Sequence, residues 1–132
     1  MKIGMNLLLW TGAADESHLP LIADIKKWGF DGIELPMFSP DCSPWGAIKK
    51  QLDDLGMSST AVCVMPEDAS LISEDAASRK RGVDHLKASI DSCVAVGAEA
   101  MGGPIYHPVG ALIGRVPNED ERKRWVECLK KV

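Results

Sequence analysis

Short apolar runs alternate with longer amphipathic segments four times along this chain. The runs have the length of strands, and in the longer segments the apolar residues recur at helical spacing. Regular alternation of this kind predicts a parallel sheet whose strands are joined by right-handed helical crossovers. The third run is apolar throughout, which is typical of a parallel strand buried on both faces. The expected strands cover about residues 2–8, 32–35, 59–65 and 99–102.

Each expected helix carries one apolar stripe that can pack against the sheet. Glycines at positions 29, 56 and 97 can end the first three helices in the left-handed conformation. The stripes are Leu21, Ile22, Ile25 and Trp28; Trp45, Ile48, Leu52 and Leu55; Val83, Leu86, Ile90 and Cys93 or Val94; and Trp125, Cys128, Leu129 and Val132.

Polar residues before each stripe are suitable helix N-caps, because their side chains can accept hydrogen bonds from free backbone amides. Prolines at positions 20 and 44 are tolerated in the first turn of a helix. The expected caps are Ser17, Ser43, Ser73 and Asn118, the last in a capping-box pattern with Glu121.

The fold class predicted by this pattern is α/β, with four βα units forming a partial TIM barrel, a (β/α)4 half-barrel. A complete barrel needs roughly 250 residues, whereas this chain has 132 and its last helix shows no stop signal. We therefore expect residues 1–132 to be one domain, the N-terminal half of such a barrel. A small doubly wound sheet fits the same strand count, but the chain has neither G-x-G-x-x-G after its first strand nor a P-loop lysine.

Charge and hydropathy argue against two kinds of partner. The formal net charge is −4, which disfavours nucleic acid because phosphate binding requires a basic surface. The basic runs at 79–81 and 122–124 fall in expected helices and are interpreted as solvated faces. No apolar run approaches the roughly 18 residues of a membrane span, so no membrane partner is expected. The apolar start lacks a clear cleavage site and is interpreted as a strand rather than a signal peptide.

The four cysteines are dispersed, and no two are separated by the short spacing of a zinc or redox motif. Dispersed cysteines in an acidic chain are typical of the reducing cytoplasm, where we expect this protein. We expect Cys63, Cys93 and Cys128 to be buried thiols.

In parallel βα folds, ligands bind beyond the C-terminal ends of the strands. This geometry selects polar, thiol, aromatic and glycine residues that follow or end the expected strands. The candidate substrate-binding residues are Asn6, Trp10, Glu34, Cys63, Gly103 and His107.

Glu34 is a carboxylate within an apolar strand, where burial is unfavourable unless the group is paired or hydrogen-bonded. It can act on a ligand as a base or a hydrogen-bond acceptor, or it can be a structural carboxylate that binds loop amides. His18 and His85 lie on expected helices and are interpreted as surface or core residues.

Residues 102–108 form the most unusual stretch, with paired glycines followed by proline, tyrosine and histidine. Paired glycines let the backbone approach a ligand closely. Tyr106 and His107 could stack on a polyol and hydrogen-bond to it. The alternative is a rigid loop whose rings cover the barrel top. Glu34 and His107 could also share a metal site, although two isolated residues are a weak signal.

Four stretches of the chain resemble the sugar epimerase/isomerase family with a xylose-isomerase-like barrel, especially the D-tagatose/D-psicose 3-epimerases. They run in order across nearly the whole chain, and the set is more specific for the superfamily than for a substrate. The stretches are 1–4 with Trp10, Gly-Phe-Asp-Gly-Ile-Glu at 29–34, Ser-Glu-Asp-Ala-Ala-x-Arg at 73–79, and Gly-Gly-Pro at 102–104.

The resemblance implies a ketose or related sugar substrate and a divalent metal, usually manganese, cobalt or magnesium. It implies two glutamates that ligate the metal and move protons through an enediolate, which suits metal-assisted acid–base chemistry. Those residues belong to strands five to eight of the family barrel, so no catalytic or metal residue transfers to this chain. What transfers is substrate lining at Asn6, around Cys63 and in the loop from Gly103. Asn6 departs from the aromatic residue common at its position in the ketose 3-epimerases.

Two functional classes follow. The chain is either the N-terminal part of a metal-dependent sugar epimerase, inactive alone, or a non-catalytic half-barrel that self-associates. A metal-dependent barrel nuclease is a weaker third reading, which the acidic charge disfavours. A half-barrel leaves two strand edges open, and open edges associate, so we expect a homodimer or larger assembly.

Overall fold

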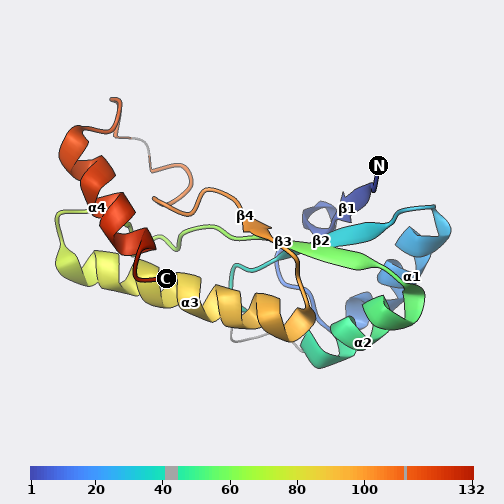
Figure 1. Ribbon diagram of the computed structural model, residues 1–132. Coiled ribbons are helices and arrows are strands. Elements are labelled where there is room, and N and C mark those ends of the chain that lie inside the picture. The colour runs from blue at the N-terminus through green and yellow to red at the C-terminus, as the bar shows by residue number, and fades with distance from the viewer. Residues whose placement is uncertain (41–44, 112) are drawn as a thin grey trace.

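A four-stranded parallel sheet in the order β1-β2-β3-β4 organises the chain. The computed structural model describes residues 1–40, 45–111 and 113–132. The strands are β1 Gly4–Asn6, β2 Gly32–Pro36, β3 Ser58–Val62 and β4 Met101–Gly102. The helices are α1 Leu19–Lys27, α2 Trp45–Leu55, α3 Ala76–Val96 and α4 Glu119–Leu129, with short 3-10 turns η1 Leu7–Leu9 and η2 Glu16–His18 (Figure 1). This sheet order confirms the predicted α/β half-barrel.

One face of the sheet carries the core, and the other is open. Alternate residues of β3, Ser59 and Ala61, are buried beneath the helices, while Thr60 and Val62 are half-exposed. No element of the described chain crosses that second face (Figure 1). The expectation that the third strand is buried on both sides is therefore wrong. We call the second face the open face and define it by Asn6, Glu34, Thr60 and Val62.

The first strand is shorter than predicted because a side chain ends it. The carbonyl of Asn6 Oδ1 accepts the backbone amide of Leu8 at 2.7 Å and caps η1. Leu7, which the sequence pattern assigns to the strand, is instead buried within this 3-10 turn.

Two helix starts differ from the predicted caps for the same physical reason. Asp15 and Asp75 cap η2 and α3, where Ser17 and Ser73 were expected. A carboxylate can accept two amides, as Asp75 does from Ala77 and Ser78, and its charge suits the positive helix end. Ser73 instead accepts the amide of Asp75 itself at 3.1 Å.

The last helix begins as predicted. Asn118 accepts the amide of Glu121, whose carboxylate accepts the amide of Asn118 in return, so the capping box is confirmed. The left-handed conformation of Gly97, with φ of 74°, also confirms its role at the end of α3. The expected cap Ser43 and the following Pro44 lie outside the described residues.

The predicted helix stripes are correct at some positions and wrong at others. Trp45, Ile48, Leu52, Val83, Leu86, Cys93 and Cys128 are buried as expected, and Trp125 packs partly buried against the core. Trp28, Ile90, Val94, Leu129 and Val132 are exposed, although the spacing predicted an inward position for all but Val94, the alternative to Cys93. On α3 the small side chains of Ser89 and Ser92 occupy the buried line instead, which brings the helix close to its neighbours. Within the described residues, no helix is both long and apolar enough to span a membrane.

Candidate functional site

The centre of the open face is a pair of polar side chains on adjacent strands. Asn6 and Glu34 are directly paired in the β1–β2 register, at the C-terminal end of β1. Asn6 Nδ2 donates to Glu34 Oε2 over 2.5 Å. Both side chains are half-buried, so the carboxylate is held in place while remaining accessible from the open face.

The orientation of the Asn6 amide is fixed from its other side. Its Oδ1 is already occupied by the amide of Leu8, so the NH2 group must be the one that faces Glu34. Within the described residues, no basic side chain hydrogen-bonds to this carboxylate. The pair therefore offers acceptor oxygens without a compensating cation, which suits the hydroxyl groups of a neutral ligand better than a phosphate or carboxylate.

Thr60 extends this polar row onto the next strand. It stands beside Glu34 in the β2–β3 register and is half-exposed on the same face. Sequence reasoning missed Thr60 because only the strand register places it next to the carboxylate.

Trp10 lies away from this row. Its ring pairs with Trp28 at the end of α1, with ring centroids 6.3 Å apart and a tilt of 32°. Both rings are about half exposed, at 47% and 55%. The structure thus brings Trp10 to the side of β1 rather than to the Asn6–Glu34 pair.

Cys63 faces the helices rather than the open face. Its side chain is fully buried, with Sγ 3.4 Å from His85 Nε2 and 3.5 Å from Ser89 Oγ on α3. Burial raises the pKa of the Cys63 thiol above its usual value. The same burial raises the pKa of Cys93. The prediction of buried, free thiols is confirmed for Cys63, Cys93 and Cys128.

Cys63 contributes to the site through its backbone, which lies against Gly102 and Gly103. The amide of Cys63 donates to the carbonyl of Gly102 at 2.9 Å. A Cβ at Gly103 would lie 2.2 Å from the Cys63 carbonyl oxygen, and the φ of Gly103 is 122°. Only glycine permits this approach, which keeps the segment after β4 close beside the segment after β3.

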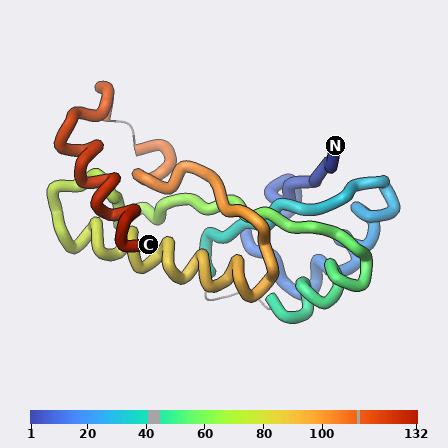
Figure 2. Tube along the Cα trace, in the orientation of Figure 1, coloured from blue at the N-terminus to red at the C-terminus, as the bar shows by residue number. Residues whose placement is uncertain are grey.

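The segments that follow β3 and β4 run side by side toward α4 (Figure 2). Met65 and Pro108 form a parallel bridge, and the amide of Leu71 donates to the carbonyl of Tyr106 at 2.9 Å. Tyr106 contacts the ring of Trp125 on α4, with centroids 5.7 Å apart.

His107 fastens these two segments together. Its Nε2 lies 2.8 Å from the carbonyl oxygen of Ala111, and its Nδ1 lies 2.8 Å from Ser70 Oγ. Because a carbonyl can only accept, Nε2 donates to Ala111, and in the neutral ring Nδ1 accepts from the Ser70 hydroxyl. Both nitrogens are therefore engaged within the protein, which favours the rigid-loop interpretation and leaves His107 no free nitrogen for a metal.

An ion pair joins the end of the loop between β4 and α4 to the first turn of α4. Sequence reasoning missed this ion pair. Arg115 makes two hydrogen bonds of 2.8 Å to the carboxylate of Glu121. These bonds and the amide of Asn118 lower the pKa of Glu121 from its usual 4.5 to about 2. The capping box indicated the position of Glu121, but nothing in the spacing indicated Arg115.

The described residues offer no cluster of metal ligands. Within residues 1–40, 45–111 and 113–132, no three histidine, cysteine, aspartate or glutamate side chains lie close enough to share one ion. The described residues therefore do not fit a resident divalent metal, and no chemical step through a metal follows from them.

Comparison with known proteins identifies the family of this chain. The model of the xylose isomerase-like TIM barrel family matches residues 22–132. The chain belongs to this family. A probable ketose 3-epimerase from Synechocystis sp. is 28% identical over 132 residues, which cover all of this chain and 46% of that protein. An L-ribulose 3-epimerase from Mesorhizobium japonicum is 26% identical over 99% of this chain and 44% of its own length.

Solved structures agree on the fold of this xylose isomerase-like barrel chain. A D-allulose 3-epimerase from Methylomonas sp. superposes with a TM-score of 0.88 and 23% identity, over 99% of this chain and 46% of that one. Another crystal structure of that enzyme contains D-allulose. The chain thus spans about half the length of the relatives it matches, and it corresponds to their N-terminal half.

Proposed function

We propose that this chain is the sugar-binding first half of a ketose 3-epimerase. The observation that carries the proposal is the Asn6–Glu34 pair at the C-terminal end of a barrel sheet, in a chain whose relatives are ketose 3-epimerases. Strand C-terminal ends are where ligands bind in this fold.

Glu34 is the recognition group in this proposal. Its carboxylate accepts hydrogen bonds from hydroxyls of an open or cyclic ketose, while Asn6 holds it in one orientation. The close backbone approach of Gly103 to Cys63 and the hydrogen bonds of His107 hold the loop that borders the sugar in this proposal. Trp10 and Cys63 do not take part through their side chains, since one pairs with Trp28 and the other is buried against α3.

The epimerisation itself requires groups that we place outside this half. In the family that the chain resembles, proton transfer runs through an enediolate, with two glutamates and a manganese, cobalt or magnesium ion. The described residues supply neither the paired carboxylates nor a metal cluster. We therefore propose that the 132-residue chain alone binds sugar weakly and does not turn it over.

The test is a titration of the chain with D-allulose and D-fructose, followed by amide NMR. Shifts confined to Asn6, Glu34, Thr60 and their neighbours support the proposal, and the Glu34→Gln variant should weaken them. The matched control is Glu99→Gln, because Glu99 is exposed and precedes β4, at the opposite end of the sheet from the Asn6–Glu34 pair. Shifts that survive Glu34→Gln unchanged would contradict the assigned role. Incubation with Mn²⁺ and assay for C3 epimers should give no product, and clear turnover would refute the proposed inactivity.

A non-catalytic, self-associating half-barrel is the second candidate, favoured by one observation. In the described chain the outer edges of β1 and β4 pair with no further strand, and Leu9, Trp10 and Trp28 are exposed beside β1. Unpaired edges and exposed apolar groups promote association. Light scattering that shows a stable monomer at micromolar concentration would contradict this candidate.

We also propose a reducing, cytoplasmic location. Cys63, Cys93 and Cys128 are buried and free, and the Cys63 thiol lies within hydrogen-bond distance of His85 and Ser89 on α3. Thiol counting on protein isolated under alkylating conditions tests this, and an oxidised Cys63, Cys93 or Cys128 would contradict it.

A further inference from the structure

A small cavity lies between the loop that follows β4 and the first turns of α4. Its volume is about 120 Å³, and its walls come from the segment after β3, the segment after β4 and α4 itself. The wall residues are mostly apolar or aromatic: Ile72, Tyr106, Pro117, Arg122 and Trp125. None of them belongs to a strand, so the cavity is distinct from the Asn6–Glu34 pair of the open face.

Contacts among the wall residues and their neighbours hold this cavity in shape. The rings of Tyr106 and Trp125 meet with centroids 5.7 Å apart and planes tilted by 50°. Arg124 Nε donates to the carbonyl of Ile72 at 2.9 Å, which joins that wall to α4. The amide of Leu71 donates to the carbonyl of Tyr106 and joins the two loop segments. A site that is already formed binds a ligand without the cost of ordering its walls.

The size of the cavity suits a single ring. An apolar cavity of about 150 Å³ can bind benzene, and this one has a similar volume of about 120 Å³. Ile72 is buried, whereas Tyr106 and Arg122 are exposed, so the cavity runs inward from the surface toward Ile72. A planar ring can pack against the two aromatic walls while a polar substituent stays near the surface.

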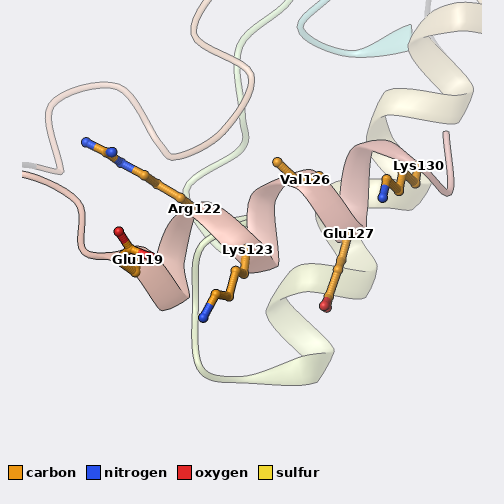
Figure 3. Close-up of a pocket in the computed structure, with 6 residues that line it drawn as sticks. All are labelled: Glu119, Arg122, Lys123, Val126, Glu127 and Lys130. Atoms are coloured by element: carbon orange, nitrogen blue, oxygen red, sulfur yellow. The ribbon is translucent and has the colours of Figure 1, made fainter.

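The charge at the surface end of the cavity favours an anionic substituent. Arg122 extends from α4 toward the preceding loop, whereas Lys123 leaves the helix on another side (Figure 3). Among the described residues, no hydrogen bond or ion pair engages the Arg122 guanidinium. The nearby Arg115 is instead paired with Glu121, and no acidic side chain of the described chain lines the cavity. A free guanidinium is planar and matches a carboxylate.

We propose that this cavity binds a small aromatic carboxylate, with its ring against Tyr106 and Trp125 and its carboxylate at Arg122. An inorganic anion would leave the apolar walls unfilled, and a neutral ring would leave the guanidinium unpaired. A single-ring ligand has few atoms, so its dissociation constant is roughly millimolar. The site does not rest on the proposed sugar binding, because the two share no residue.

Benzoate is the probe for this site, and benzamide is its neutral counterpart of nearly the same shape. Both are titrated into the full 132-residue chain at neutral pH and followed by amide NMR. Benzoate should shift the amides around Ile72, Tyr106 and Trp125 and leave those of the open face unmoved. Benzamide should bind at least about threefold more weakly, as expected for the loss of a partly exposed ion pair.

The Arg122→Gln variant tests the charge. It should weaken benzoate binding at least about threefold and leave benzamide binding unchanged, which also shows that the variant is folded. The matched control is Lys123→Gln, which removes the same charge one residue along, outside the walls of the cavity. This control should bind benzoate like the native chain.

Several results would overturn the proposal. Equal weakening of benzoate by the two variants would mean that net charge alone attracts it. Benzoate that binds no more tightly than benzamide would remove the role of Arg122, and an absence of shifts at about 10 mM benzoate would remove the site. Displacement of benzoate by D-allulose would assign the cavity to the sugar site. A sugar titration without effect would leave the benzoate site standing.

Discussion

The side-chain amide of Asn6 joins the carboxylate of Glu34 across the first two strands while its carbonyl caps the turn that follows β1. One residue thus ends a strand and orients the only acidic group of the open face among the described residues. Fold and recognition are coupled at this point, because the geometry of Glu34 depends on the turn that Asn6 caps.

Asn6→Ala should therefore lower both stability and sugar binding. Loss of the cap and of the bond to Glu34 should reduce the free energy of unfolding by about 1–2 kcal/mol, the range for such caps. Urea denaturation measures this change. Glu34→Gln keeps an acceptor for the Asn6 amide and should lose less stability than Asn6→Ala. If the two variants are equally destabilised, the pair does not have the role assigned to it.

Gly103→Ala should destabilise the chain far more than Gly102→Ala. The new methyl group at position 103 would meet the Cys63 carbonyl oxygen at 2.2 Å in a backbone conformation with φ of 122°. Strain of this kind is worth about 1–3 kcal/mol. At Gly102 nothing lies within 4 Å of the added carbon, so this neighbour is a matched control. Equal denaturation midpoints for the two variants would contradict the close approach of Gly103 to the Cys63 carbonyl.

The sequence predicts a local contact where only one arrangement satisfies the pattern, and it does not predict contacts that depend on strand register. The capping box of Asn118 and Glu121 is confirmed because its two bonds lie within four residues. Ser73 was preferred to Asp75 because both are competent caps two residues apart, and only the start of the helix decides between them.

In the candidate site, too, the sequence indicates which residues are involved but not the contacts that depend on strand pairing. The rule that ligands bind at strand ends selected Asn6 and Glu34, yet their mutual contact follows from the pairing of β1 with β2. The burial of the Cys63 thiol was predicted, but a purely apolar run hides the two-residue alternation that turns this thiol toward α3. Trp10 follows the 3-10 turn after Asn6, and its ring contact with Trp28 is indicated by no spacing in the sequence.

Acid should destabilise the chain partly through Glu121. Its pKa is lowered from 4.5 to about 2, chiefly by Arg115, so the folded state favours the ionised carboxylate. That contribution is present in full above about pH 4.5 and is lost as the pH falls toward 2. Melting temperatures measured from pH 6 to pH 2 should fall less steeply for Glu121→Gln than for the native chain. Glu67→Gln, at an exposed position, is the control and should follow the native curve.

Cys63 and Cys93 should resist alkylation while the chain is folded. Burial raises the pKa of both thiols, so at pH 8 the folded protein holds less of the reactive thiolate than a free cysteine would. Peptide mapping after a timed pulse of iodoacetamide measures each site separately. In urea both should react at the rate of a free thiol. Rapid labelling of Cys63 in the native chain would show that the packing between β3 and α3 opens readily.

His107→Ala should loosen the loop that borders the site without unfolding the sheet. The variant loses the bonds of the ring to Ser70 and Ala111, which together hold the segment after β4 against the segment after β3. The amide of Leu71, bonded to the carbonyl of Tyr106, is the reporter, and its hydrogen exchange should become about tenfold faster or more, as expected for two lost bonds. Val109→Ala, in the same loop but with a side chain that is 67% exposed, is the control and should leave this rate unchanged. Unchanged exchange in His107→Ala would mean that the bridge between Met65 and Pro108, in the segments after β3 and β4, is sufficient to hold the loop.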